Sequence, residues 1–254
     1  MSVPVARPVL CTPPMLEDMH VHSTFSDGRD DLATNVGAAE GRGLLRMACV
    51  DHVRVDTDWL PEFTRAVREL DNRSPVELLA CVEAKILDSS GRLDIPRSLA
   101  GVDRVYIADH QVPWIGGCRK PAAVRREIQL GQLRPIPFFE LLVEAILGAV
   151  RRHPGAVLAH LFSIVPKVGL SEDDIPLALI EELAFECARQ DVDLEIDERW
   201  RCPSPRVVAA FAALGVPVLA STDSHRADTI GRYRYVQQTL VEVQAIRRDE
   251  RVAC

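Results

Sequence analysis

The sequence predicts an α/β protein organised around one parallel β-sheet. Seven short apolar segments typical of buried strands alternate along the chain with longer segments typical of helices. Signals for the start and the end of a helix fall between these segments, and most of the histidines fall where a predicted strand ends. Seven parallel strands can form an open sheet or a closed barrel, and the periodicity of the sequence leaves both possible.

The predicted strands are runs rich in Val, Ile, Leu and Ala. They cover residues 16–21, 45–50, 76–82, 104–108, 156–159, 193–196 and 217–220. The predicted helices between them cover residues 32–40, 59–70, 138–152, 175–189 and 205–214. The last helix is the clearest, because Ser204 can cap its start, Pro205 suits its first turn and Gly215 suits its end. Right-handed crossovers between consecutive strands would make all of them parallel.

Length and composition limit the domain organisation and the class of protein. A chain of 254 residues with 47% apolar residues can form one large core, and single α/β barrels commonly have this length. We expect one domain over residues 16–254, after an irregular, Pro-rich lead-in at residues 1–15 that does not resemble a signal peptide. No apolar run approaches the roughly 20 residues of a membrane helix. A net charge of −7 argues against a protein that binds long nucleic acid non-specifically.

The seven cysteines are widely spaced and include no CxxC pair. This pattern argues against a disulfide framework and against a thiolate zinc site. We therefore expect reduced cysteines that pack in the core, in a cytoplasmic protein.

Residues 111–137 interrupt the alternation of strands and helices. The segment is rich in Pro and Gly and shows no clear element, so we expect a long loop insertion, which in compact domains is usually functional or disordered. Against the single acidic residue Glu127 it carries five basic residues, namely Arg119, Lys120, Arg125, Arg126 and Arg134. This excess either marks the approach of an anion or belongs to a solvated basic loop or a short surface helix.

Six of the seven histidines lie at or just after the end of a predicted strand. These are His20, His22, His52, His110, His160 and His225, and the acidic residues Glu83, Glu195 and Asp223 lie within or just after the third, sixth and seventh strands. Only His153 stands apart. The carboxyl ends of parallel strands meet on one face of a barrel, where active sites form. We therefore expect these side chains to share one pocket.

The first strand runs into His20-Val21-His22-Ser23-Thr24-Phe25-Ser26-Asp27-Gly28. Residues i and i+2 of a strand point to the same side, so His20 and His22 can bind one ion together, and the Asp27-Gly28 turn can bring a carboxylate to it. An isolated HxH motif is usually no metal site, but this turn and the other strand-end histidines favour one. Imidazole and carboxylate ligands suit Zn²⁺, Mn²⁺ and Fe²⁺, and nine ligands suit two or three ions. Such a cluster can hold a bridging hydroxide as nucleophile, whereas no Ser or Cys stands in an activated motif such as GxSxG.

In this order, the motifs resemble those of the PHP (polymerase and histidinol phosphatase) family. The resemblance spans residues 19–233 and is carried by the first-strand motif and by Val50-Asp51-His52, Glu83, Ala108-Asp109-His110, Leu158-Ala159-His160 and Ser221-Thr222-Asp223-Ser224-His225. It implies a distorted (βα)7 TIM-like barrel and three metal sites. The implied ligands are His20, His22, Glu83 and Asp223 for the first ion, Glu83, His110 and His160 for the second, and Asp27, His52 and His225 for the third.

The segments 195–204 and 221–228 are similar to the histidinol-phosphatase branch of this family. In that branch, phosphate-binding cations follow the fifth-strand histidine and the sixth-strand glutamate, which implies Lys167 and Arg199 here. Arg226 and Arg54 are weaker candidates, and Glu195 either binds metal or orients a ligand histidine. Asp197, Glu198 and the basic segment depart from the branch and speak against histidinol phosphate itself.

The expected activity is hydrolysis of a small phosphomonoester by attack of metal-bound hydroxide on phosphorus. Two or three Mn²⁺, Zn²⁺ or Fe²⁺ ions would be positioned by Glu83, and Asp27 or Asp223 would carry the proton of the leaving group. The expected partner is a small phosphorylated substrate, with no long nucleic acid and no membrane. The alternatives are a phosphodiesterase acting on a cyclic phosphate or a short oligonucleotide, an amidohydrolase-type enzyme, and a non-catalytic metal-stabilised scaffold. The sequence leaves the substrate, the native metal and the oligomeric state open.

Overall fold

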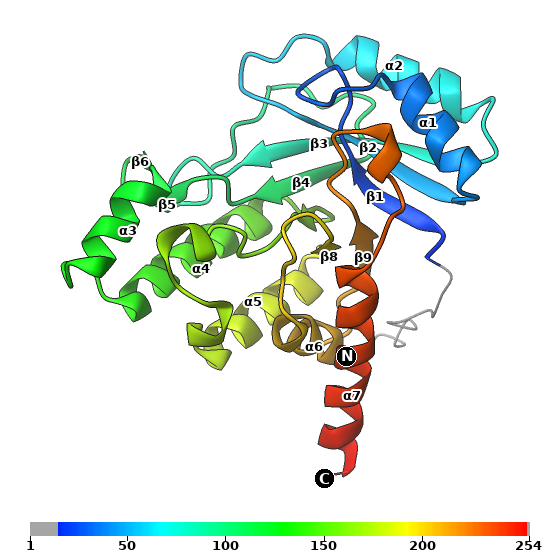
Figure 1. The fold of residues 1–254 in the computed structure, drawn as a ribbon. Coiled ribbons are helices and arrows are strands. Elements are labelled where there is room, and N and C mark those ends of the chain that lie inside the picture. The colour runs from blue at the N-terminus through cyan, green and yellow to red at the C-terminus, as the bar shows by residue number, and fades with distance from the viewer. Residues whose placement is uncertain (1–14, 253–254) are drawn as a thin grey trace.

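Seven parallel strands form the centre of the computed structural model, which describes residues 15–252 (Figure 1). They are β1 (Glu17–Val21), β2 (Arg46–His52), β3 (Glu77–Lys85), β4 (Arg104–Ala108), β7 (Val157–Leu158), β8 (Asp193–Asp197) and β9 (Val218–Ser221). Each overlaps a strand predicted from the sequence, and neighbours in the chain are neighbours in the sheet. The expected lead-in at residues 1–15 lies, apart from Met15, outside the described residues.

The two edge strands meet, so the sheet curls into a nearly closed barrel. Val21 pairs in parallel with Ser224, and the N–H of His22 donates to the Ser224 carbonyl at 2.8 Å. Behind this pairing, the buried Asp18 carboxylate accepts the N–H and the hydroxyl of Thr222 at 3.0 and 2.5 Å. These bonds tie β1 to the end of β9. The prediction of a (βα)7 TIM-like barrel is confirmed, and the choice between an open sheet and a barrel is resolved.

Six of the helices are packed outside or beside the barrel (Figure 1). They are α1 (Leu32–Gly41), α2 (Leu60–Asp71), α4 (Pro135–Arg152), α5 (Leu177–Arg189), α6 (Pro205–Ala213) and α7 (Tyr235–Val252). The first five match the predicted helices, and α7 was not predicted. At the start of α6, Ser204 is the capping residue and Pro205 opens the first turn, but the Ser204 side chain makes no cap bond; its N–H donates to Glu172 at 2.7 Å instead.

Two apolar layers result from the alternation of side chains along the strands. A small cluster fills the barrel, where the buried Tyr106 donates its hydroxyl to the Met19 carbonyl at 2.5 Å. The larger layer lies between the strands and the helices. The filled barrel leaves the carboxyl ends of its strands as the place for a site.

Residues 111–137 are not the long loop that the sequence predicts. They form an antiparallel hairpin of β5 (Val112–Trp114) and β6 (Gly117–Arg119), followed by helix α3 (Pro121–Gln129). Gly116 turns the hairpin with a φ of +78°. Arg119 stacks on the Trp114 ring and forms a paired contact with Glu127. Strands of three residues carry no periodicity, so these tertiary contacts, and not local propensity, define the hairpin.

Further predictions concern the membrane and the cysteines. Within residues 15–252, no helix has both the length and the apolar character needed to cross a membrane. The described cysteines, Cys49, Cys81, Cys118, Cys187 and Cys202, are free thiols. Cys11 and Cys254 lie outside the described part of the chain.

Candidate metal centre

All nine side chains predicted as ligands gather at the carboxyl end of the barrel. His20 lies in β1 and His22 directly follows it, His52 ends β2, and Glu83 lies in the second half of β3. The others lie on the connections that follow strands, namely Asp27, His110, His160, Asp223 and His225. Each of the nine has a ligand atom within 3.5 Å of a ligand atom of another member.

Glu83 is the centre of the cluster, and its side chain is 1% exposed. Imidazole nitrogens approach its two oxygens at 2.8–3.5 Å, and they belong to His20, His22, His52, His110 and His160. A single buried carboxylate cannot accept a hydrogen bond of good geometry from five rings at once. Divalent cations held by this carboxylate and the surrounding rings would account for the arrangement.

Asp27 reaches the cluster from the turn after β1. Its oxygens lie 3.3 Å from His225 Nε2 and 3.5 Å from His52 Nε2, and its side chain is 54% exposed. Gly28 makes this turn possible, because a Cβ at that position would lie 2.6 Å from the carbonyl carbon of His22. The SDG motif therefore folds back against the strand that carries the first two histidines.

Asp223 and His160 hold unusual backbone conformations. Their φ angles are +47° and +30°, in the region that favours glycine. Strained residues of this kind are concentrated at functional sites. At Asp223 the conformation brings Oδ1 to 3.0 Å from His22 Nε2 and 3.4 Å from His225 Nδ1.

The spacing of the donor atoms fits divalent ions. Two ligand atoms bound at 2.0–2.2 Å to one tetrahedral ion lie about 3.4 Å apart. His20 Nε2 and His22 Nε2 both lie 3.5 Å from Glu83 Oε2, and the two Asp27 contacts fall at 3.3 and 3.5 Å. A mixed set of imidazole and carboxylate donors suits Zn²⁺, Mn²⁺ and Fe²⁺. The residues present therefore fit a cluster of such ions.

Buried polar atoms without hydrogen-bond partners also indicate a site for cations. Five buried atoms of the cluster make no hydrogen bond of acceptable geometry, and they are His20 Nε2, His22 Nδ1, Glu83 Oε2, His160 Nδ1 and Asp223 Oδ1. Leaving a buried polar atom without a partner costs about 1–3 kcal/mol. A bound cation would accept the lone pairs of such atoms.

The groups of nearby donors overlap but do not repeat the implied ligand sets. Four groups have donor atoms within 4.8 Å of one another: His22, Asp27, His52 and His225; His20, His22 and Asp223; His52, Glu83 and His110; and His20, Glu195 and Asp197. His20, His22 and His52 each belong to two groups, so the geometry allows them to serve neighbouring ions. The division of the nine residues among the ions stays a prediction.

Carboxylates around the cluster orient its histidines. The buried Glu195 lies 2.9 Å from His20 Nδ1, which turns His20 Nε2 toward Glu83. Asp109 accepts the Ser163 hydroxyl at 2.8 Å and lies 3.8 Å from His160 Nδ1. Such partners fix the tautomer and the direction of a ligand imidazole. Glu195 also forms a group of nearby donors with His20 and Asp197, so the choice between binding metal and orienting His20 stays a prediction.

A further carboxylate, Asp51, organises the turn after β1. It accepts the N–H and the hydroxyl of Ser23 at 3.0 and 2.6 Å and the hydroxyl of Ser26 at 2.5 Å. The sequence analysis assigned no role to Asp51 or Asp109. A signal was present, because each directly precedes a ligand histidine at the end of a strand.

Neighbouring charges strongly shift the pKa values of residues in the cluster. Burial raises the pKa of Glu83, but the surrounding histidines, His110 first, lower this pKa well below its usual range. Burial also opposes the charge on His20, yet Glu195 raises the pKa of His20 well above its usual value. Histidines that are protonated in the absence of ions must release protons to bind them.

Of the four predicted phosphate-binding cations, the structure brings two to the cluster. Lys167 Nζ lies 3.9 Å above the Trp200 ring, whose centroid is 6.2 Å from that of His160. Arg199 contacts the His225 ring and lies 3.6 Å from an Asp223 oxygen. Arg226 instead pairs with Asp228 at 3.0 Å, and Arg54 is exposed on the loop after β2.

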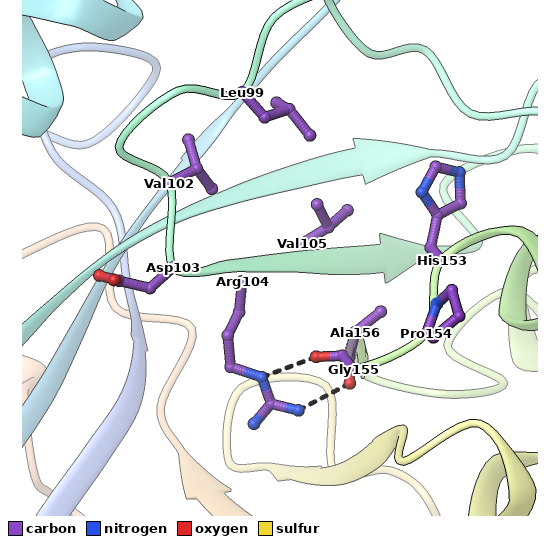
Figure 2. Close-up of a pocket in the computed structure, with 9 residues that line it drawn as sticks. All are labelled: Leu99, Val102, Asp103, Arg104, Val105, His153, Pro154, Gly155 and Ala156. Atoms are coloured by element: carbon purple, nitrogen blue, oxygen red, sulfur yellow. Dashed lines mark hydrogen bonds between the residues drawn. The ribbon is translucent and has the colours of Figure 1, made fainter.

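A hollow at the opposite end of the barrel contains His153, the histidine that stands apart in the sequence (Figure 2). It lies beside the amino ends of β4 and β7. Figure 2 shows Arg104 donating to the carbonyls of Gly155 and Ala156, at 3.0 and 2.8 Å. Burial lowers the pKa of His153. None of the predicted ligands lines this hollow.

Comparison with known proteins agrees with this geometry. No protein-family model matches the chain. Phosphoribosyl 1,2-cyclic phosphate 1,2-diphosphodiesterase of Eggerthella lenta is 38% identical over 74 residues, which are 29% of this chain and 26% of that protein. The chain thus aligns with about a quarter of the relative's length.

Among solved structures, the histidinol phosphate phosphatase (HisK) of Lactococcus lactis, complexed with zinc, L-histidinol and phosphate, has a similar fold. The TM-score is 0.59 at 17% identity, over 91% of this chain and 93% of that chain. At this identity the likeness shows the fold alone. The fold, together with the partial sequence identity, confirms the resemblance to PHP-type phosphoesterases that the motifs predict.

Proposed function

We propose that this chain is a metal-dependent phosphatase that hydrolyses the phosphomonoester of a small metabolite. The observation that carries the proposal is the buried Glu83 carboxylate with five imidazoles at 2.8–3.5 Å, at the carboxyl end of a barrel. The nine clustered residues would hold two or three divalent ions. When bound, these ions would activate a water molecule as the nucleophile and neutralise the phosphoryl oxygens.

The residues around the cluster divide the remaining tasks. Lys167 and Arg199 lie beside it and would bind the non-bridging oxygens of the phosphate. Asp27 is the better candidate to carry the proton of the leaving group, because its side chain is 54% exposed. The two oxygens of Asp223 already face His22 and Trp200, at 3.0 and 2.7 Å.

The test is a phosphate-release screen of the full chain on sugar phosphates, nucleotides and amino-alcohol phosphates, with Mn²⁺, Zn²⁺ or Fe²⁺ supplied. Glu83→Gln should lower the rate of release about a thousandfold, while Glu62→Gln, at an exposed residue of α2, serves as the matched control. Metal analysis runs in parallel. Bound ions without phosphate release on any ester would favour the scaffold, and cleavage of lactams or carboxylic esters alone would favour an amidohydrolase-type enzyme.

A phosphodiesterase is the second candidate, because the Eggerthella lenta relative acts on a cyclic phosphate. Comparing p-nitrophenyl phosphate, its bis-ester and a five-membered cyclic phosphate separates the two activities. A higher kcat/KM for the monoester supports the phosphatase. A higher value for the bis-ester or the cyclic ester replaces it with the diesterase.

Several finer expectations stay predictions. They are the choice among Mn²⁺, Zn²⁺ and Fe²⁺, the number of ions, the cytoplasmic location and the absence of membrane and long nucleic-acid partners. The excess of carboxylates in the chain, with a net charge of −7, supports the last of these.

A further inference from the structure

Trp200 lies on the connection after β8, with its indole against the cluster. Its Nε1–H donates to Asp223 Oδ2 at 2.7 Å. The other oxygen, Asp223 Oδ1, lies 3.0 Å from His22 Nε2 and makes no hydrogen bond of good geometry. The indole therefore occupies one oxygen of a predicted ligand and leaves the other directed at the histidines.

The backbone that carries Trp200 is tied down on both sides. The N–H of Trp200 donates to Asp197 Oδ1 at 2.6 Å, and the N–H of Asp197 donates to the Cys202 carbonyl at 2.8 Å. Glu198 accepts three backbone N–H groups at the start of α7, those of residues 234, 235 and 236, at 2.9–3.1 Å. A helix start stabilises such a carboxylate. The connection is thus held between β8 and α7, which fixes the position of the indole in advance.

The indole ring contacts a second group of the site. Lys167, in the short 3-10 helix η1 (Pro166–Val168), places its Nζ 3.9 Å from the ring centroid. This distance is typical of a cation–π interaction. Trp200 is 41% exposed, so this pair lies at the solvent side of the cluster. One side chain therefore contacts a predicted metal ligand through its N–H and a predicted phosphate-binding cation through its ring.

We propose that Trp200 is a positioning residue that connects the metal-binding half of the site, at Asp223, with the phosphate-binding half, at Lys167. Its N–H directs the Asp223 carboxylate toward the bound ions, and its ring holds the Lys167 ammonium where a phosphate would arrive. The Lys167 half rests on the proposed function, because it needs a phosphate ligand. The Asp223 half needs only that the cluster binds metal, so the two halves can fail separately.

Two substitutions separate the roles of the N–H and the ring. Trp200→Phe keeps an aromatic face for Lys167 but removes the donor to Asp223. Trp200→Leu removes both. Trp114→Phe, in the β5–β6 hairpin, is the matched control, because its ring contacts Arg119 and no predicted ligand.

Metal affinity is measured by equilibrium dialysis of the metal-free full chain against Mn²⁺, and phosphate affinity by calorimetry of inorganic phosphate at saturating Mn²⁺. Trp200→Phe should weaken binding of one ion about 10- to 100-fold and leave phosphate affinity unchanged. Trp200→Leu should weaken the metal to the same extent and also weaken phosphate about two- to fivefold. Lys167→Met should weaken phosphate alone.

If Trp200→Phe binds Mn²⁺ as tightly as the wild-type chain does, the proposed effect of Trp200 on Asp223 is wrong. If Trp200→Leu binds phosphate as tightly as the wild-type chain does, the proposed effect of Trp200 on Lys167 is wrong. Lys167→Met leaves the indole in place, so it tests the phosphate contact even if Trp200→Leu does not fold. A chain that binds Mn²⁺ but releases phosphate from no ester refutes the proposed function, and the dialysis of Trp200→Phe still decides the Asp223 half.

Discussion

The two ends of the barrel differ in how their polar groups are paired. At the amino end, Arg104 pairs with Asp193 at 2.5 Å and donates to two carbonyls, and Asp103 accepts from Arg68 at 2.6 Å and from the Ala80 N–H at 2.7 Å. Around Arg104, donors and acceptors match without any further ligand. At the carboxyl end, imidazoles surround one carboxylate and several buried atoms lack a hydrogen bond.

The difference separates stabilising polar groups from functional ones. A matched set, such as the one around Arg104, is complete and lowers the free energy of the folded chain. An unmatched set costs free energy until something else binds, which is the pattern of a ligand site. Both sets lie at the ends of the same strands, so the comparison can be tested by changing one end and measuring the properties of the other.

The largest effect should follow from Glu83→Gln at the carboxyl end. Removing the charge of the carboxylate that would hold the ions should lower kcat/KM about a thousandfold, because metal-assisted charge stabilisation contributes several kcal/mol. Metal content per chain should fall as well. The check is phosphate release together with metal analysis. Wild-type activity and metal content in this variant would remove Glu83 from the centre of the site.

At the amino end, Arg104→Met should lower the free energy of unfolding by about 1–3 kcal/mol, because it leaves the partly buried Asp193 without its partner. Metal affinity and kcat/KM of the folded fraction should stay unchanged. Urea unfolding and dialysis against Mn²⁺ measure the two quantities. A clear loss of metal affinity in a folded variant would break the division between the ends.

Glu172 is a partly buried carboxylate outside the cluster. Burial raises its pKa to about 7, and its Oε2 accepts the Ser204 N–H. The folded chain then binds the proton more tightly than the unfolded chain. The stability that this proton supplies is full below the ordinary value of 4.5 and is lost as the pH rises through 7. The loss is at most about 3 kcal/mol.

Urea unfolding of the metal-free chain between pH 4.5 and 8 measures this dependence. Glu172→Gln should flatten the part of the profile between pH 5 and 7. An unchanged slope in Glu172→Gln would show that the dependence arises from other groups.

The smallest effect concerns the basic helix α3. The Arg125 side chain lies against Gly169, two residues beyond Lys167, with its Nε 3.5 Å from where a Gly169 Cβ would stand. Arg125→Gln should raise KM for a phosphate ester about two- to threefold, because an exposed cation near the site is largely screened. Arg126→Gln, one position along the helix and so on another face, is the control. Equal KM values in all three proteins would exclude a role for α3 in binding.

Much of the site could be predicted because its ligands follow strands. The seven strands and five helices appear in the sequence as apolar runs with caps. A residue at the carboxyl end of any parallel strand must lie at the same end of the barrel. His20, His52 and Glu83 follow this rule directly. Asp51 and Asp109, which accept hydrogen bonds from Ser23 and Ser163, were missed, because the contacts of a carboxylate that precedes a histidine depend on the tertiary structure.

The order of strands and helices, and the set of imidazoles and carboxylates at the carboxyl ends of the strands, could be predicted from the sequence, because both depend on local pattern and on the direction of parallel strands. Which groups contact one another was settled by the tertiary structure. It closed the barrel through Asp18 and Thr222 and built a hairpin from three-residue strands. It also paired Arg119 with Glu127, which removes that charge from the excess counted along the chain, and it placed Trp200 on Asp223. These contacts join residues that are far apart in sequence, or they lie in segments too short to show a periodic pattern, so no local pattern encodes them.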